Sequence, residues 1–112
     1  MKSAAIAFPV LPGKSDQGRR FAEEVKVREA EFARSLGQRG LTREDWYLQN
    51  TPQGDMIIVV MEGDDPLQTM QGWAGSSDPF DVWFKTQAQE ISGIDFSQPM
   101  PVLPEHIFAW KR

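Results

Sequence analysis

The side chains that could do chemistry are few and widely spaced in this 112-residue sequence. His106 is the single histidine, and an imidazole that titrates near neutrality could act as a general base or as a haem ligand. It could equally be a partly exposed strand residue beside a proline-rich loop, and we favour that interpretation. His106, Tyr47 and Arg28 are the polar groups that we retain as weak catalytic candidates.

Arg28 stands out because it interrupts an apolar stripe. Phe21, Val25, Phe32 and Leu36 recur at helical spacing around it. Under such a helix a guanidinium could anchor a carboxylate or a phenolate. Alternatively it extends to solvent or pairs with an acidic residue, which we consider the simpler expectation.

Aromatic residues suggest a ligand pocket for a flat, apolar molecule. Trp46, Trp83, Trp110 and Phe32 are the candidates for its walls, with Tyr47 beside them. Aromatic side chains on strands and amphipathic helices more often belong to a core or a dimer interface. Both interpretations remain open from the sequence.

Composition excludes several chemistries. The absence of cysteine removes thiol nucleophiles, cysteine-ligated zinc and iron–sulfur clusters. Acidic clusters at 62–65 and 78–81 stand at predicted helix starts, where carboxylates cap amides, so we expect neither a metal nor a cofactor. The net charge of −4 argues against nucleic-acid binding. No segment has membrane-spanning length or the pattern of a signal peptide, so a cytoplasmic location is the default expectation.

Periodicity and turn residues predict the elements that would position these groups. Residues 3–10, 42–51 and 56–61 read as strands, the last two joined by a turn at 52–55. One long helix is expected over 16–36 and a short one from 65–66 to about 74. Residues 78–93 form a complete helix pattern with an aromatic inner face. After a proline-rich connector at 97–104, residues 104–111 alternate like a fourth strand.

This order of elements predicts a single ferredoxin-like α+β domain over residues 1–112. The expected topology is β-α-β-β-α-β, with a four-stranded antiparallel sheet in the order 4-1-3-2 and helices on one face. Because the segment 56–61 is apolar on both faces, the face without helices would expose apolar surface. We expect a homodimer through that open sheet face; the alternative is that residues 97–104 fold over it.

The chain resembles the dimeric α+β barrel superfamily. The resemblance covers the whole chain in element order, and it is carried by DPFDVWFKTQAQEISGID at 78–95 and PEHIFAW at 104–110, which are similar to a small bacterial family without an assigned activity. Superfamily members include cofactor-free monooxygenases, muconolactone-type isomerases, haem-degrading enzymes and chlorite dismutases. The resemblance therefore implies a cleft between helices and sheet, and no particular reaction.

Two functions follow as hypotheses. The first is a homodimeric barrel that binds an apolar or aromatic small molecule and carries out cofactor-independent oxygenase- or isomerase-type chemistry. The second is a non-enzymatic dimerisation or regulatory module with a filled cleft. A cleft of a few hundred Å3 that contains His106, Arg28 or Tyr47 would favour the first, and a cleft filled by Trp83, Phe84 and Phe32 the second.

Overall fold

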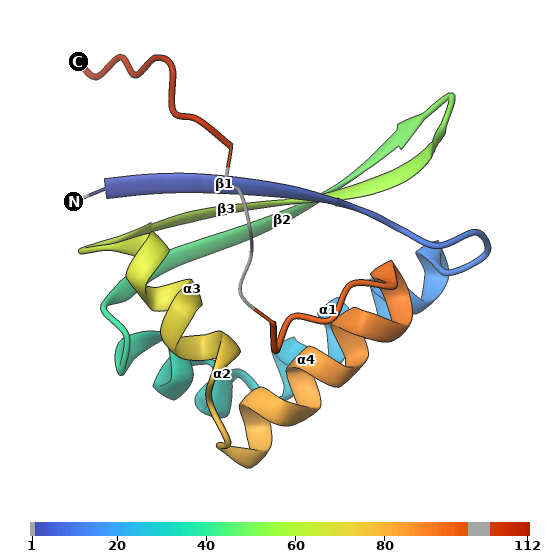
Figure 1. Ribbon diagram of the computed structural model, residues 1–112, viewed down its shortest axis with the longest axis horizontal. Coiled ribbons are helices and arrows are strands. Elements are labelled where there is room, and N and C mark those ends of the chain that lie inside the picture. Colours follow the sequence, from blue (N-terminus) through green and yellow to red (C-terminus); the bar gives the residue numbers. More distant parts are fainter. Residues whose placement is uncertain (1, 99–103) are drawn as a thin grey trace.

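The computed structural model describes residues 2–98 and 104–112 and shows a sheet with helices on one face (Figure 1). The strands are β1 (Lys2–Pro9), β2 (Leu41–Thr51) and β3 (Gly54–Gly63), all antiparallel, in the order β1-β3-β2. The helices of the described residues are α1 (Ser15–Val27), α2 (Glu29–Gly37), α3 (Pro66–Ala74) and α4 (Pro79–Ser92).

The strands follow their sequence signals closely. The apolar segment of β3 lies between the other two strands, as expected for the central strand of the sheet. Pro52 and Gln53 form the turn between β2 and β3, and Gly54 follows with φ of +122°, which a residue with a side chain rarely adopts. β1 ends at Pro9 on an edge strand, where a missing N–H is tolerated.

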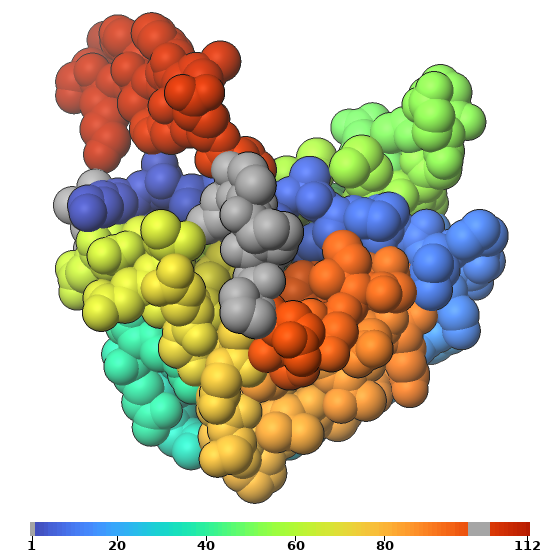
Figure 2. Space-filling model, in the orientation of Figure 1, coloured from blue at the N-terminus to red at the C-terminus, as the bar shows by residue number. Residues whose placement is uncertain are grey.

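The prediction of a ferredoxin-like β-α-β-β-α-β fold with a four-stranded sheet in the order 4-1-3-2 is wrong for this chain. The α+β class fits, but the sheet of the described residues has three strands and is covered by four helices. Residues 104–112 lie in no strand and stand apart from the helical body on the other side of the sheet (Figures 1 and 2). Their alternation would favour a strand only beside a free strand edge, and they pair with none. Residues 99–103 of the expected proline-rich connector lie outside the described residues.

The long helix predicted over 16–36 is two helices. Arg28 separates α1 from α2, with φ of −97° and ψ of 32°. The break stands where the apolar stripe is interrupted. The Arg28 guanidinium lies over the Trp83 ring, with Cζ 4.2 Å from the centroid, and its Nε and Nη2 donate hydrogen bonds to the Glu31 carboxylate.

The bounds of α3 and α4 agree well with their signals. Asp65 caps α3 by accepting a hydrogen bond from the Gln68 N–H, and α4 starts at Pro79 and ends at Gly93, whose φ is +76°. Asp78 makes no side-chain cap, contrary to expectation. None of the helices in the described residues is long and apolar enough to span a membrane.

A buried polar network joins α2, α4 and the loop between α3 and α4. The Asp81 carboxylate accepts hydrogen bonds from Ser35 Oγ at 2.6 Å, Ser76 Oγ at 2.7 Å and Arg39 Nη2 at 2.8 Å. Burial would raise the pKa of Asp81, but these three donors outweigh it, so the pKa lies below the ordinary value. The sequence predicted a helix-start carboxylate here, and the structure uses it to hold three segments together.

Candidate functional site

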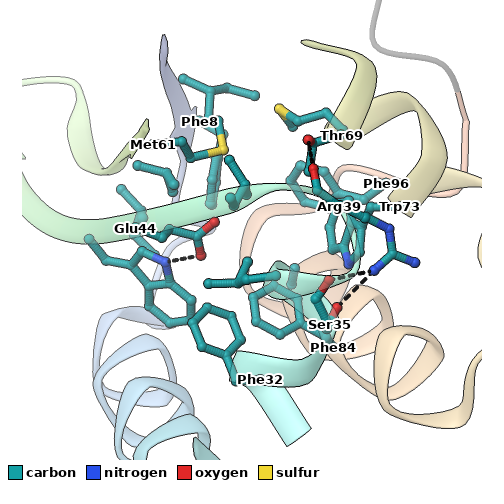
Figure 3. A pocket seen from close by; sticks show the side chains of 18 of the residues that line it. Phe8, Phe32, Ser35, Arg39, Glu44, Met61, Thr69, Trp73, Phe84 and Phe96 are labelled. Carbon is teal, nitrogen blue, oxygen red and sulfur yellow. Dashed lines mark hydrogen bonds between the residues drawn. The ribbon is translucent and has the colours of Figure 1, made fainter. Parts of the chain in front are cut away.

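A cavity of about 90 Å3, partly open to solvent, lies between the helices and the covered face of the sheet (Figure 3). All three strands and all four helices contribute to its wall, and Phe96 closes it beyond α4. Most of the described lining residues are apolar. The polar ones are Ser35, Arg39, Glu44 and Thr69.

Aromatic rings form much of the wall. Phe84 lies near its centre, with ring centroids 4.9 Å from Phe21, 5.6 Å from Trp46 and 5.6 Å from Trp73. The Phe32 ring is stacked with the Phe84 ring, with centroids 5.9 Å apart. Such a wall offers flat, polarisable surface to a ring-shaped ligand.

Glu44 reaches the cavity because of the geometry of β2. It has the same strand parity as Trp46, which also lines the cavity, so its carboxyl group is directed inward (Figure 3). An irregularity in the pairing between Leu41 and Arg43 adds one residue, and Leu41 therefore faces inward as well. Gly63 opposite permits this close approach, because a Cβ there would lie 2.4 Å from the carbonyl oxygen of Gly40.

The Glu44 carboxyl group has an apolar environment and a single described hydrogen-bond donor. Trp46 Nε1–H donates to its Oε2 at 2.8 Å. Burial raises the pKa of Glu44 to about 7; the Trp46 hydrogen bond opposes that rise, and the neighbouring Asp45 adds to it. The residue is half-buried, and it borders the cavity. The result is a carboxyl group that exchanges its proton near neutral pH.

The other polar end of the cavity is already satisfied internally. Arg39 donates from Nη1 to the Ser35 carbonyl oxygen at 2.9 Å and from Nη2 to Asp81. The Thr69 hydroxyl lies 2.7 Å from the carbonyl oxygen of Arg39. These hydrogen bonds hold the side chains of this part of the cavity wall in place. In contrast, one Glu44 oxygen has no hydrogen bond within the described residues.

Only some of the residues that the sequence predicted for the pocket line the cavity. Of the proposed pocket residues, Trp46 and Phe32 line the cavity. Trp83 is not among the lining residues and packs against Phe21, with ring centroids 5.6 Å apart, while Trp110 is exposed in the C-terminal segment.

The three polar candidates lie outside the lining. Tyr47 is 56% exposed and has the opposite strand parity to the cavity-lining Trp46. His106 is exposed, with Nε2 2.9 Å from the Phe108 carbonyl oxygen. Arg28 pairs with Glu31 at 2.9 Å and lies over Trp83. Their catalytic roles stay predictions, and the structure does not bring them together.

The sequence reasoning did not single out Glu44. The available signal was its spacing of two from Trp46 and four from Leu48, which places an acidic residue on the apolar face of a strand. The criterion set for the cleft gives a mixed result. The cavity is neither filled nor several hundred Å3 in size, and its walls include Phe84 and Phe32. Within the described residues no group of three or more metal-binding side chains comes together.

Comparisons with known proteins show the family and a shared fold, and they leave the activity open. The family model described as "Family of unknown function (DUF6176)" matches residues 1–107, so the chain belongs to that family. No curated protein gives a significant match. Among solved structures, tetracenomycin F2 cyclase from Streptomyces glaucescens, a type-II polyketide cyclase, is similar with a TM-score of 0.64 and 14% identity, over 100% of this chain and 99% of that one. This similarity shows the shared fold.

Proposed function

We propose that the cavity binds a small apolar molecule that carries one aromatic ring. The observation that supports this most directly is an open cavity walled by aromatic rings, with one carboxyl group directed into it. The similarity in fold to a polyketide cyclase is in keeping with a small-molecule role. The chemistry that the lining side chains favour is an isomerase-type proton transfer, in which protonated Glu44 gives its proton to one atom of the ligand and takes a proton back from another.

Cavity size limits the ligand. A volume of about 90 Å3 is smaller than the roughly 150 Å3 of an apolar cavity known to hold benzene. A single ring therefore fits only with its edge in the opening or after a small movement of the wall. Small ligands gain a limited binding free energy per heavy atom. For a ligand of about seven heavy atoms we therefore expect a dissociation constant on the order of 0.1 to 1 mM.

Methionine methyl groups provide the test. Met61 and Met70 line the cavity, whereas Met56 has the opposite strand parity to Met61 on β3. With 13C-methyl methionine NMR, toluene should shift the Met61 and Met70 signals saturably and leave Met56 unchanged. Equal shifts at Met56, or no saturable shift up to the solubility of toluene, would contradict the proposal.

Two variants on adjacent residues sharpen the experiment. Val59 lines the cavity and Val60, next to it on β3, points to the other face. Val59→Phe should fill the cavity and abolish toluene binding, and Val60→Phe should retain it. Circular dichroism establishes that both variants are folded. Toluene binding retained in a folded Val59→Phe variant would place the ligand elsewhere and favour the alternative of a non-enzymatic module.

We also propose that a second copy of the chain covers the open sheet face. The helices of the described residues lie on the other face (Figure 1). The uncovered face presents small and apolar residues on β1 and β3, such as Ala5, Ile58 and Val60, beside polar residues on β2. On the same side the C-terminal segment exposes Ile107, Phe108 and Trp110, at 84%, 78% and 68%. Three strands of about eight residues present roughly 380 Å2, about half of the 800 Å2 per partner of a stable interface. Docking of the nine C-terminal residues on the partner's sheet would supply the rest.

Sedimentation of the wild type and three variants tests this assembly. The wild type should be a dimer at micromolar concentration. Ile58→Asp on the open face, or removal of residues 104–112, should raise the dimer dissociation constant at least a hundredfold. Val82→Asp is the control, because Val82 is an exposed apolar residue on α4, on the helical side. A monomeric wild type, or equal effects of Ile58→Asp and Val82→Asp, would refute the proposal.

A further inference from the structure

We propose that the cavity selects an uncharged aromatic ligand with a carbonyl group, and that Glu44 recognises it by donating a hydrogen bond to the carbonyl oxygen. The inference rests on the proposed function, since it requires that the cavity binds a ligand. It adds the chemical class of that ligand and names the side chain that binds its carbonyl group.

The position of the Glu44 proton follows from its partner. An indole N–H can only donate, so the Oε2 atom that faces Trp46 Nε1 at 2.8 Å must accept. In the protonated acid the O–H therefore resides on Oε1. Figure 3 shows the carboxyl group directed into the cavity, where the described residues offer Oε1 no hydrogen-bond partner. A ligand acceptor would complete that bond.

The surrounding charges favour an uncharged ligand. Arg39 is the other charged side chain in the described lining, and its guanidinium is engaged by Asp81 and Ser35. Next to Glu44 on the strand, Asp45 is paired with Arg43 at 2.7 Å. A ligand carboxylate would thus enter an apolar space without a free cation, and it would meet the same desolvation that disfavours the ionised form of Glu44.

Burial raises the pKa of Glu44 to about 7, so the carboxyl group changes its protonation state in the physiological pH range. Only the protonated acid can donate to a carbonyl oxygen, and the apparent affinity scales with the protonated fraction. That fraction falls from about nine tenths at pH 6 to about one tenth at pH 8. The affinity for a carbonyl ligand should fall about tenfold over the same interval.

Acetophenone, toluene and benzoate are the probes, each titrated at pH 6 and pH 8 against the Met61 methyl signal of the full chain. Acetophenone should bind about tenfold more weakly at pH 8, and benzoate more weakly than acetophenone at both values. Glu44→Gln should bind acetophenone equally at both pH values, because its amide N–H donates throughout. Glu44→Leu should lose the preference for acetophenone over toluene. Glu62→Gln, on the opposite face of the sheet, should behave as the wild type.

The failure of this inference can be told apart from the failure of the proposed function. If toluene binds but acetophenone shows no pH dependence, or if Glu44→Leu keeps the carbonyl preference, the role of Glu44 is refuted while the cavity remains a binding site. If benzoate binds more tightly than acetophenone, the ligand class is refuted. If no probe shifts the Met61 and Met70 signals at either pH, both proposals are refuted.

Discussion

Replacing Glu44 by glutamine should stabilise the folded protein at pH 8 and leave its stability unchanged at pH 4. Burial raises the pKa of Glu44 in the folded chain to about 7, from the ordinary value of 4.5. Between these values the folded state binds more protons than the unfolded state, so stability falls as the pH rises from 4.5 to 7. The loss continues through the folded pKa, is nearly complete at pH 8 and is constant above it.

The magnitude follows from the pKa difference. About 2.5 pKa units at 1.36 kcal/mol each correspond to roughly 3 kcal/mol in the free energy of unfolding. At about 2.1 cal/mol/K per residue, the unfolding entropy of 112 residues converts this to a rise in Tm of roughly 14 °C at pH 8. Glutamine keeps an oxygen for the Trp46 N–H, so the substitution removes the charge and retains the hydrogen bond.

Urea unfolding of the variant and the wild type at several pH values between 4 and 8, at one protein concentration, provides the assay. The difference between the two proteins isolates Glu44, because all other groups titrate in both. It should rise from zero near pH 4 to about 3 kcal/mol at pH 8. The same comparison for Glu62→Gln, on the opposite face of the sheet, provides the control. A difference that stays constant with pH would mean that Glu44 is not desolvated, and the reasoning about the cavity would be wrong.

Other predictions concern the scaffold of the cavity. Asp81→Ala leaves three donors in the buried network without an acceptor, and it should lower the free energy of unfolding by about 3 to 5 kcal/mol; a loss below 1 kcal/mol in urea unfolding would contradict this. Lys85→Met removes an ammonium group that donates to three carbonyl oxygens around the end of α3, each at 2.9 Å, and should cost about 2 to 3 kcal/mol in the same assay. Gly63→Ala would force a Cβ against the Gly40 carbonyl and should cost about 1 to 3 kcal/mol, with altered Met61 methyl shifts.

Local signals predicted the elements whose boundaries depend on neighbouring residues alone. The hairpin at Pro52 and Gln53, the start of α3 at Pro66 and the end of α4 at Gly93 are set by backbone conformations that these residue types favour. The break at Arg28 also had a local signal, the interrupted apolar stripe, but the sequence did not show whether the interruption would be tolerated within one helix.

Features that depend on distant partners could not be read in this way. The alternating residues 104–111 have the pattern of a strand, yet a strand forms only when its backbone hydrogen-bonds to a neighbouring strand, and these residues pair with none of β1, β2 and β3. The inward direction of Glu44 is a property of β2 as a whole, and the added residue near Leu41 depends on the close approach of Gly63 from β3. When the inward face of β2 is predicted from its apolar residues alone, a charged residue on the same face, such as Glu44, is missed.

A comparison of Asp81 with Glu44, both in the described part of the chain, shows why Glu44 is the residue to test. Asp81 is 1% exposed and accepts hydrogen bonds from three side chains, and its pKa lies below the ordinary value. Glu44 has one donor, and its pKa lies well above the ordinary value. The fold can therefore supply a buried carboxylate with hydrogen-bond donors where that carboxylate has a purely structural role. A carboxyl group left incompletely satisfied beside an open, aromatic cavity weakens the free protein, and a ligand that supplies the missing partner would recover that stability.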